Sequence, residues 1–142
     1  MKLHICLNQP PLAGYVNIDA AKTQVDLGNM DMVAEPAECT DLIINDILKF
    51  MPYEKIPEVV QHLASKLRHG GKITFIFTDI NSIIREYNRG SVNEKTLNQL
   101  LYNGARSCFS CDYIKRIVKA VRLEIKEIQI SVEQVIIVAE RP

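Results

Sequence analysis

The chain has 142 residues, of which 47% are hydrophobic, so it is long enough to build one domain around a real core, and its composition is not that of a disordered protein. Its 17 Lys and Arg residues balance its 17 Asp and Glu residues, which argues against a nucleic-acid binder that relies on overall positive charge. No apolar run approaches the roughly 20 residues that cross a bilayer, and the N-terminus lacks a signal-peptide pattern. We therefore expect one soluble, cytoplasmic domain over residues 1–142.

The first two predicted elements are short strands joined by a loop. "KLHICL" predicts a buried strand, and "YVNID" predicts a second strand that ends at Asp19. Only about eight residues separate them, fewer than the dozen that a parallel crossover usually needs. Two alternatives stay open: the first crossover helix is reduced to a turn, or the second strand is misplaced.

The middle of the chain predicts two further strands and a helix. A short strand is expected near residues 24–26, and "TDLIIND" predicts the next one, because it is a compact apolar run bounded by acids. A helix is predicted from about Tyr53 to Leu67, and Gly70-Gly71 is expected to end it before the strand "KITFIFTD". Its apolar positions recur on one helical face, at Ile56, Val59, Val60, Leu63 and Leu67.

The last third predicts three short helices and a hairpin. "INSIIREY", "SVNEKTLNQLLY" and "SCDYIKRIVKAV" are the helices, and Ser91 with Glu94 forms a capping box at the start of the second. "LEIKEIQISV" and "QVIIVAER" are separated only around Glu133, so they must pair as antiparallel strands. Together these elements predict an α/β fold: a Rossmann-like, mostly parallel sheet with helices on both faces and a C-terminal antiparallel hairpin.

The four cysteines do not indicate a metal site. Cys108 and Cys111 form one C-x-x-C, but no second pair and no nearby His completes a ligand set. We expect reduced thiols at a loop–helix boundary and no metal.

The order of these elements resembles that of the compact class I S-adenosylmethionine-dependent methyltransferases. "GYVNIDA" is similar to the family's second strand with its acidic end, and "LRHGGK" stands where the family usually has Leu, a basic residue, Pro and two Gly. Residues from about 81 to 112 resemble the family's lid helices, and "CDYIKRIVKAVRLEIKEIQIS" resembles its last helix and hairpin. Two stretches depart from the family: Cys6-Leu7-Asn8-Gln9 replaces its glycine-rich loop, and Leu48-Lys49-Phe50 replaces its frequent Leu-Glu-His.

The resemblance implies that S-adenosylmethionine is the cofactor and that Leu7, Asn8, Gln9 and Asp19 contact it. Asn tolerates left-handed backbone geometry, so Asn8 can replace a glycine; alternatively, the loop is filled in by its own side chains. Asp19 would accept hydrogen bonds from both ribose hydroxyls, or it merely caps a turn.

The resemblance extends the cofactor site to three more residues and supplies a catalytic candidate. Asp31 and Met32 would lie around the adenine, although a solvated loop explains Asp31 equally. Asn45 and Asp46 follow the strand "TDLIIND", where they would face the cofactor sulfur or cap the next helix. Asp46 is the predicted general base. Thr78-Asp79 would lie near the acceptor entrance or cap a helix.

Two functional hypotheses follow. The first is an S-adenosylmethionine-dependent methyltransferase whose acceptor, whether small molecule, sugar, protein or nucleic acid, is unknown. The second is a catalytically inactive methyltransferase-like binding or assembly module that forms a homo-oligomer or holds a protein partner. An open groove above Asn8 and Asp19 would favour the first, whereas a groove filled by Leu7, Gln9 and Pro10 would favour the second.

Overall fold

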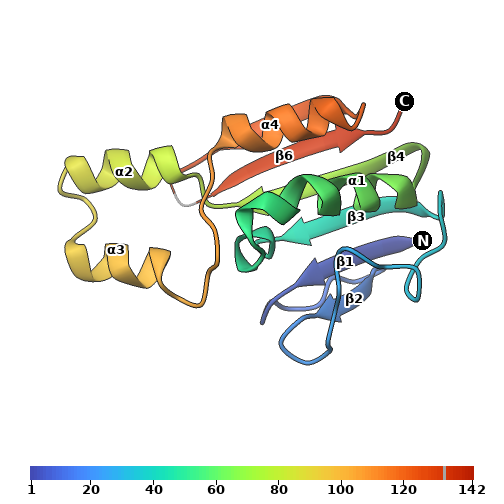
Figure 1. Ribbon diagram of the computed structural model, residues 1–142, viewed down its shortest axis with the longest axis horizontal. Coiled ribbons are helices and arrows are strands. Elements are labelled where there is room, and N and C mark those ends of the chain that lie inside the picture. Colours follow the sequence, from blue (N-terminus) through green and yellow to red (C-terminus); the bar gives the residue numbers. More distant parts are fainter. Residues whose placement is uncertain (133) are drawn as a thin grey trace.

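The computed structural model describes residues 1–132 and 134–142. Its centre is a six-stranded sheet in the order β2-β1-β3-β4-β6-β5 (Figure 1). The strands are β1 (Lys2–Cys6), β2 (Val16–Asp19), β3 (Cys39–Asn45), β4 (Leu67–Phe77), β5 (Glu124–Ile130) and β6 (Val135–Glu140). The helices are α1 (Ile56–Lys66), α2 (Ile80–Asn88), α3 (Glu94–Leu101) and α4 (Cys111–Ala120), and 3-10 turns at Leu48–Phe50 and Tyr53–Lys55 precede α1.

Strand pairing confirms the predicted fold class. β2, β1, β3 and β4 are parallel neighbours, whereas β6 runs antiparallel between β4 and β5. The chain therefore forms a mostly parallel, Rossmann-like sheet that ends in an antiparallel hairpin. Among the described residues, no helix is long and apolar enough to cross a membrane.

The connection between β1 and β2 is a turn-rich loop without a helix. Of the two alternatives, the first is therefore correct: the crossover helix is reduced to a turn, and the second strand lies where it was predicted. The Asn17 side chain braces this loop: its Oδ1 accepts the Leu12 N–H at 2.8 Å, and its Nδ2 donates to the carbonyls of Leu12 and Tyr15 at 3.0 Å. The same Oδ1 lies 2.8 Å from Nδ1 of His4 on β1. A side-chain network thus replaces the hydrogen bonds that a crossover helix would have supplied.

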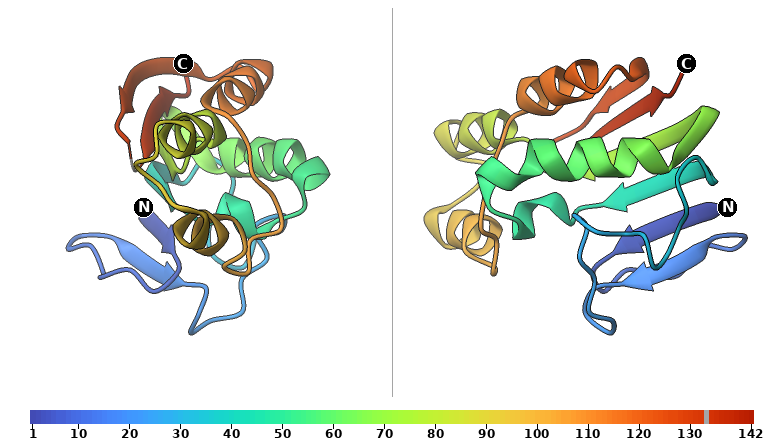
Figure 2. Two further views of the ribbon diagram at one scale, coloured as in Figure 1. Left: turned by 90° about the vertical axis from the view of Figure 1, so that its left-hand side faces the viewer. Right: turned by 45° about the vertical axis from the view of Figure 1, so that its right-hand side comes forward.

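In the part of the chain that the structure describes, helices cover one face of the sheet, which differs from the expectation of helices on both faces. Figure 2 (left) shows α1 and α4 on the same side. The connections β2–β3, β3–β4 and β4–β5 all progress in one direction across the sheet, so right-handed crossovers place them on one face. Among the crossovers between parallel strands, the β1–β2 connection runs the other way, and it consists of the loop alone; the β5–β6 connection is a hairpin and crosses neither face.

The core lies between the sheet and the helices α1 and α4, which cover one of its faces. Alternate residues of the central strands point into it, which gives β6 its repeating pattern of buried and half-buried positions. The helices contribute the apolar stripe that the sequence predicts. Buried members from the sheet are Leu3, Ile5, Leu42, Ile44, Ile73, Phe75, Val135 and Ile137, and those from the helices are Ile56, Val59, Val60, Leu63, Ile114, Ile117 and Val118.

Residues 24–26 form no strand, so that prediction is wrong. The segment instead packs Leu27, Met30 and Ala34 into the core as an irregular crossover, and the Met30 N–H donates to Nε2 of His62 on α1 at 2.8 Å. Hydrogen bonds to side chains, rather than to a neighbouring strand, satisfy backbone N–H groups of this segment.

The Gly70-Gly71 pair lies inside β4 and does not end α1, so its predicted role is also wrong. The helix stops at Lys66, and Leu67 already has extended geometry. A Cβ on Gly71 would lie 2.8 Å from the Cys39 carbonyl oxygen, so glycine is needed here for the close approach of β3. The predicted capping box at Ser91 is replaced by Asn93, whose Oδ1 accepts the Thr96 N–H at 2.8 Å.

Candidate functional site

An open groove lies at the carboxyl ends of β1, β2 and β3. Its volume is about 340 Å³. Leu7 follows β1, Ala20 follows β2 and Ile47 follows β3, so three neighbouring strands contribute to it. The remaining lining residues are Val25, Asp26, Leu27, Phe50, Met51, Pro52 and Arg106.

The loop after β1 and the carboxylate of Asp19 meet at this edge of the sheet. Oδ1 of Asp19 accepts the N–H groups of Asn8 and Ala21, both at 3.0 Å, and Oδ2 lies 4.0 Å from Nζ of Lys22. These backbone hydrogen bonds, with a smaller contribution from Lys22, lower the pKa of Asp19. Asp19 therefore holds the loop in place as an ionised group.

Asn8 adopts the left-handed conformation, with φ of 52°, that the sequence analysis expected of a glycine substitute. The loop nevertheless leaves the groove open. Leu7 lines the groove, whereas Gln9 and Pro10 are exposed and lie outside its wall. Of the two arrangements that the sequence left open, the structure has the unfilled one. Asn8, Gln9 and Asp19 border this edge without lining the groove itself.

Asp31 and Met32 lie apart from the groove. Asp31 forms an ion pair with Lys66, which is buried near the C-terminus of α1, and hydrogen bonding to this lysine lowers the pKa of Asp31. Met32 is 97% exposed. The acid that lines the groove is Asp26, which the sequence analysis missed. The signal that could have found it is its position between the apolar residues Val25 and Leu27, which also line the groove.

Asn45 and Asp46 are adjacent in sequence but face different surroundings. Nδ2 of Asn45 lies 3.3 Å from Nε2 of His4, on the sheet face without helices. Asp46 has φ of 53°, and its N–H donates to the Ile76 carbonyl at 2.8 Å. This left-handed turn directs Asp46 into a second, smaller pocket.

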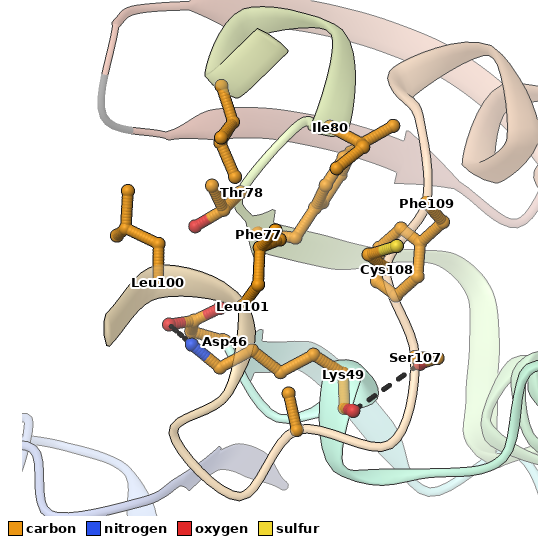
Figure 3. A pocket seen from close by; sticks show the side chains of 12 residues that line it. Asp46, Lys49, Phe77, Thr78, Ile80, Leu100, Leu101, Ser107, Cys108 and Phe109 are labelled. Carbon is orange, nitrogen blue, oxygen red and sulfur yellow. Dashed lines mark hydrogen bonds and ion pairs between the residues drawn. The ribbon is translucent and has the colours of Figure 1, made fainter. Parts of the chain in front are cut away.

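The second pocket lies between the end of β4 and helices α2 and α3 (Figure 3). Oδ2 of Asp46 accepts a hydrogen bond from Nζ of Lys49 at 2.9 Å, while its Oδ1 is buried without a hydrogen-bond partner among the described residues. A buried oxygen without a partner is costly unless a ligand supplies the donor. The pocket has a volume of about 40 Å³; its other lining residues are Phe77, Thr78, Ile80, Ile83, Leu100, Leu101, Ala105, Ser107, Cys108 and Phe109.

Residues 105–109, which we call the strap, connect the two cavities. The carbonyl of Lys49 accepts the N–H groups of Arg106 at 2.7 Å and of Ser107 at 3.0 Å (Figure 3 shows the further contact from Oγ of Ser107, at 3.4 Å). Asp79 fixes the far end, because it caps α2 through Ser82 and its Oδ1 accepts the Cys111 N–H at 2.8 Å. The sequence analysis anticipated neither the strap nor the position of Arg106 in the lining of the groove, because both depend on contacts with Lys49, more than fifty residues away.

Metal ligation finds no support in the part of the chain that the structure describes, where no group of three His, Cys, Asp or Glu side chains is arranged to hold an ion. All four cysteines are free thiols.

Comparison with known proteins gives a structural match only. No protein-family model matches the sequence, and no curated protein does. Among solved structures, an O-methyltransferase family protein from Burkholderia thailandensis superposes with a TM-score of 0.61 at 14% identity, over 89% of this chain and 36% of that one. A SAM-dependent methyltransferase from Methanosarcina mazei gives a TM-score of 0.61 at 10% identity, over 82% and 65%.

A third match is magnesium protoporphyrin IX methyltransferase from Synechocystis PCC 6803 with bound SAH, with a TM-score of 0.56 at 16% identity, over 90% of this chain and 51% of that one. The chain thus spans between about a third and two thirds of the length of these proteins. At such low identity the likeness concerns the fold. The fold of this chain is that of the class I S-adenosylmethionine-dependent methyltransferases.

Proposed function

We propose that this chain binds S-adenosylmethionine in the open groove and takes part in methyl transfer to an acceptor whose chemical class is open. The observation that carries the proposal is the position of the groove. From β1 the chain moves one way across the sheet to β2, whereas β3 lies on the other side of β1. Ligands of open α/β sheets bind at the carboxyl ends of strands where the strand order reverses in this manner. Leu7 after β1 and Ile47 after β3 flank that point.

The residues present suit the nucleoside part of the cofactor. The groove walls are mostly apolar, as a purine ring requires, and Asp26 adds one acceptor for an amino or hydroxyl donor. The loop end differs from glycine-rich loops, because Cys6 is buried and the Asn8 N–H is already donated to Asp19. We therefore assign the nucleoside to Ala20, Asp26, Ile47 and Phe50 and only apolar contact to Leu7.

Bound S-adenosylmethionine would supply a methyl group already activated on its sulfonium, so the chain's task is to align the acceptor and exclude water. Asp46 suits the alignment, because it lines the second pocket and its Oδ1 has no hydrogen-bond donor among the described residues. This oxygen would accept a hydrogen bond from an acceptor hydroxyl or amine and take the proton as it leaves. Lys49 holds Oδ2 and so orients the carboxylate.

The experiment is a calorimetric titration with S-adenosylmethionine and S-adenosylhomocysteine, followed by transfer of labelled methyl groups to a panel of acceptors. We expect both ligands to bind, and Asp46→Asn to retain binding of S-adenosylhomocysteine while transfer falls about 100-fold or more. Asp112→Asn, on the exposed first turn of α4, is the matched control. Absence of binding at millimolar ligand would reject the proposal.

We further propose a reducing, cytoplasmic setting for the chain. The support is that Cys108 and Cys111, one exposed and one half-buried, are both free thiols. Thiol counting on protein purified without reductant tests this, and a Cys108–Cys111 disulfide in freshly isolated protein would contradict it.

A further inference from the structure

The strap is a shared wall between the two cavities. Arg106 lines the large groove, and its immediate neighbours Ala105 and Ser107 line the small pocket beside Asp46. Figure 3 shows Ser107, Cys108 and Phe109 passing along that pocket. One short segment therefore contacts both the proposed nucleoside and the proposed acceptor.

Arg106 is the cation that lines the groove, where the other charged residue is Asp26. Within residues 1–132 and 134–142, Arg106 forms no ion pair, and its side chain is exposed. A planar guanidinium next to apolar walls is suited to stack on a flat aromatic ring such as a purine.

Lys49 links the position of the strap to the position of Asp46. Its carbonyl accepts two strap N–H groups, and its ammonium pairs with the Asp46 carboxylate. A shift of the strap therefore displaces the residue that orients Asp46. The end of the strap is anchored, because Phe109 is buried and packs against Phe77 and Tyr113. Its beginning follows α3, none of whose residues is buried, so we expect any shift at residues 105–108.

We propose that Arg106 closes on the nucleoside and thereby fixes the strap, so that cofactor binding shapes the acceptor pocket. This inference rests on the proposed function, and it adds an order to it: the nucleoside binds first, and the acceptor pocket gains its final form afterwards. The coupling passes through the sequence Arg106, Ser107, Lys49 and Asp46.

The first measurement is calorimetry with S-adenosylhomocysteine. Arg106→Ala should weaken binding about 3- to 30-fold. The affinity of Arg106→Lys should fall between those of the unmodified chain and Arg106→Ala, because lysine keeps the charge but lacks the planar guanidinium. The control is Arg89→Ala, at the end of α2, which removes an exposed arginine paired with Glu86 and should bind like the unmodified chain.

The second measurement follows the strap itself through the exposed thiol of Cys108, in a Cys111→Ser background. Burial raises the pKa of the Cys111 thiol, so this background removes only a slowly reacting competitor. Saturating S-adenosylhomocysteine should slow maleimide labelling of Cys108 at least about fivefold, and this protection should be lost in Arg106→Ala at saturation.

The outcomes separate the two proposals. If the unmodified chain binds S-adenosylhomocysteine but Arg106→Ala binds and protects Cys108 equally well, the inference is overturned and the proposed function stands. If the unmodified chain does not bind the ligand at all, both fail. Weaker binding of S-adenosylhomocysteine by Arg106→Ala, together with lost protection of Cys108, supports the proposal that Arg106 closes on the nucleoside and fixes the strap.

Discussion

A larger side chain in the lining of the groove should weaken nucleoside binding and leave the fold intact. Ala20 lies directly after β2, is half-buried and lines the groove of about 340 Å³. In Ala20→Leu the larger side chain occupies space that the purine or ribose needs. Extra carbon atoms forced into a fitted site cost about 1–3 kcal/mol, which corresponds to about 5- to 150-fold weaker binding. Calorimetry with S-adenosylhomocysteine measures the change directly.

Ala120→Leu is the matched control, because the same substitution falls on an exposed helix position beside a separate hollow between α1 and α4. It should bind the ligand like the unmodified chain. Urea unfolding should place both variants within about 1 kcal/mol of the unmodified chain, since the groove is open to solvent. Equal affinity in Ala20→Leu and Ala120→Leu would refute the assignment of the groove.

Three further predictions concern stability. Lys66→Met should keep the free energy of unfolding within about 1 kcal/mol of the unmodified value or raise it, because the one partner of the buried ammonium among the described residues is the exposed Asp31. Lys66→Ala should lose about 2–5 kcal/mol to a cavity, and the reverse order in urea unfolding would contradict this. Gly71→Ala should cost about 1–3 kcal/mol in the same assay, since its Cβ would meet the Cys39 carbonyl; an unchanged midpoint would be unexpected. The lowered pKa values of Asp19 and Asp31 add stability that is present above about pH 4 and is lost as the pH falls through the pKa values of the folded state. The urea midpoint should therefore drop in acid, and it should drop less in Asp31→Asn, which lacks one of the two carboxylates.

The sequence was informative where a local pattern dictates structure. Short apolar runs and β-branched residues predicted the strands of the sheet, and the apolar stripe from Ile56 to Leu63 predicted α1. The short separation around Glu133 required a hairpin. Glu133 itself lies outside the described residues. Ser110 caps α4, because its Oγ accepts the Tyr113 N–H at 3.1 Å.

The sequence failed where long-range packing decides. A short strand was expected near residues 24–26, but the segment instead buries Leu27 and Met30, and the Met30 N–H donates to His62 on α1. Gly70-Gly71 has a typical helix-ending composition, yet the close approach of Cys39 explains the second glycine. Helices on one face only follow from the direction of the crossovers, which requires the strand order.

The candidate site was predicted in its location but only partly in its membership. Asn8 and Asp19 meet through a hydrogen bond, as the position of strand ends implies. Asp26, rather than Asp31, lines the groove, because a buried lysine 35 residues away pairs with Asp31. No local pattern reports such a partner, and none reports the strap contact to Lys49.

The central claim is that the groove at the ends of β1, β2 and β3 holds the nucleoside. Its most direct test is a titration of isotopically labelled protein with S-adenosylhomocysteine, followed by amide chemical shifts. The account predicts that saturable shifts gather at Leu7, Ala20, Asp26, Ile47 and Arg106. Shifts gathered instead at the remote hollow around Ala120, or no saturable shifts at millimolar ligand, would contradict it.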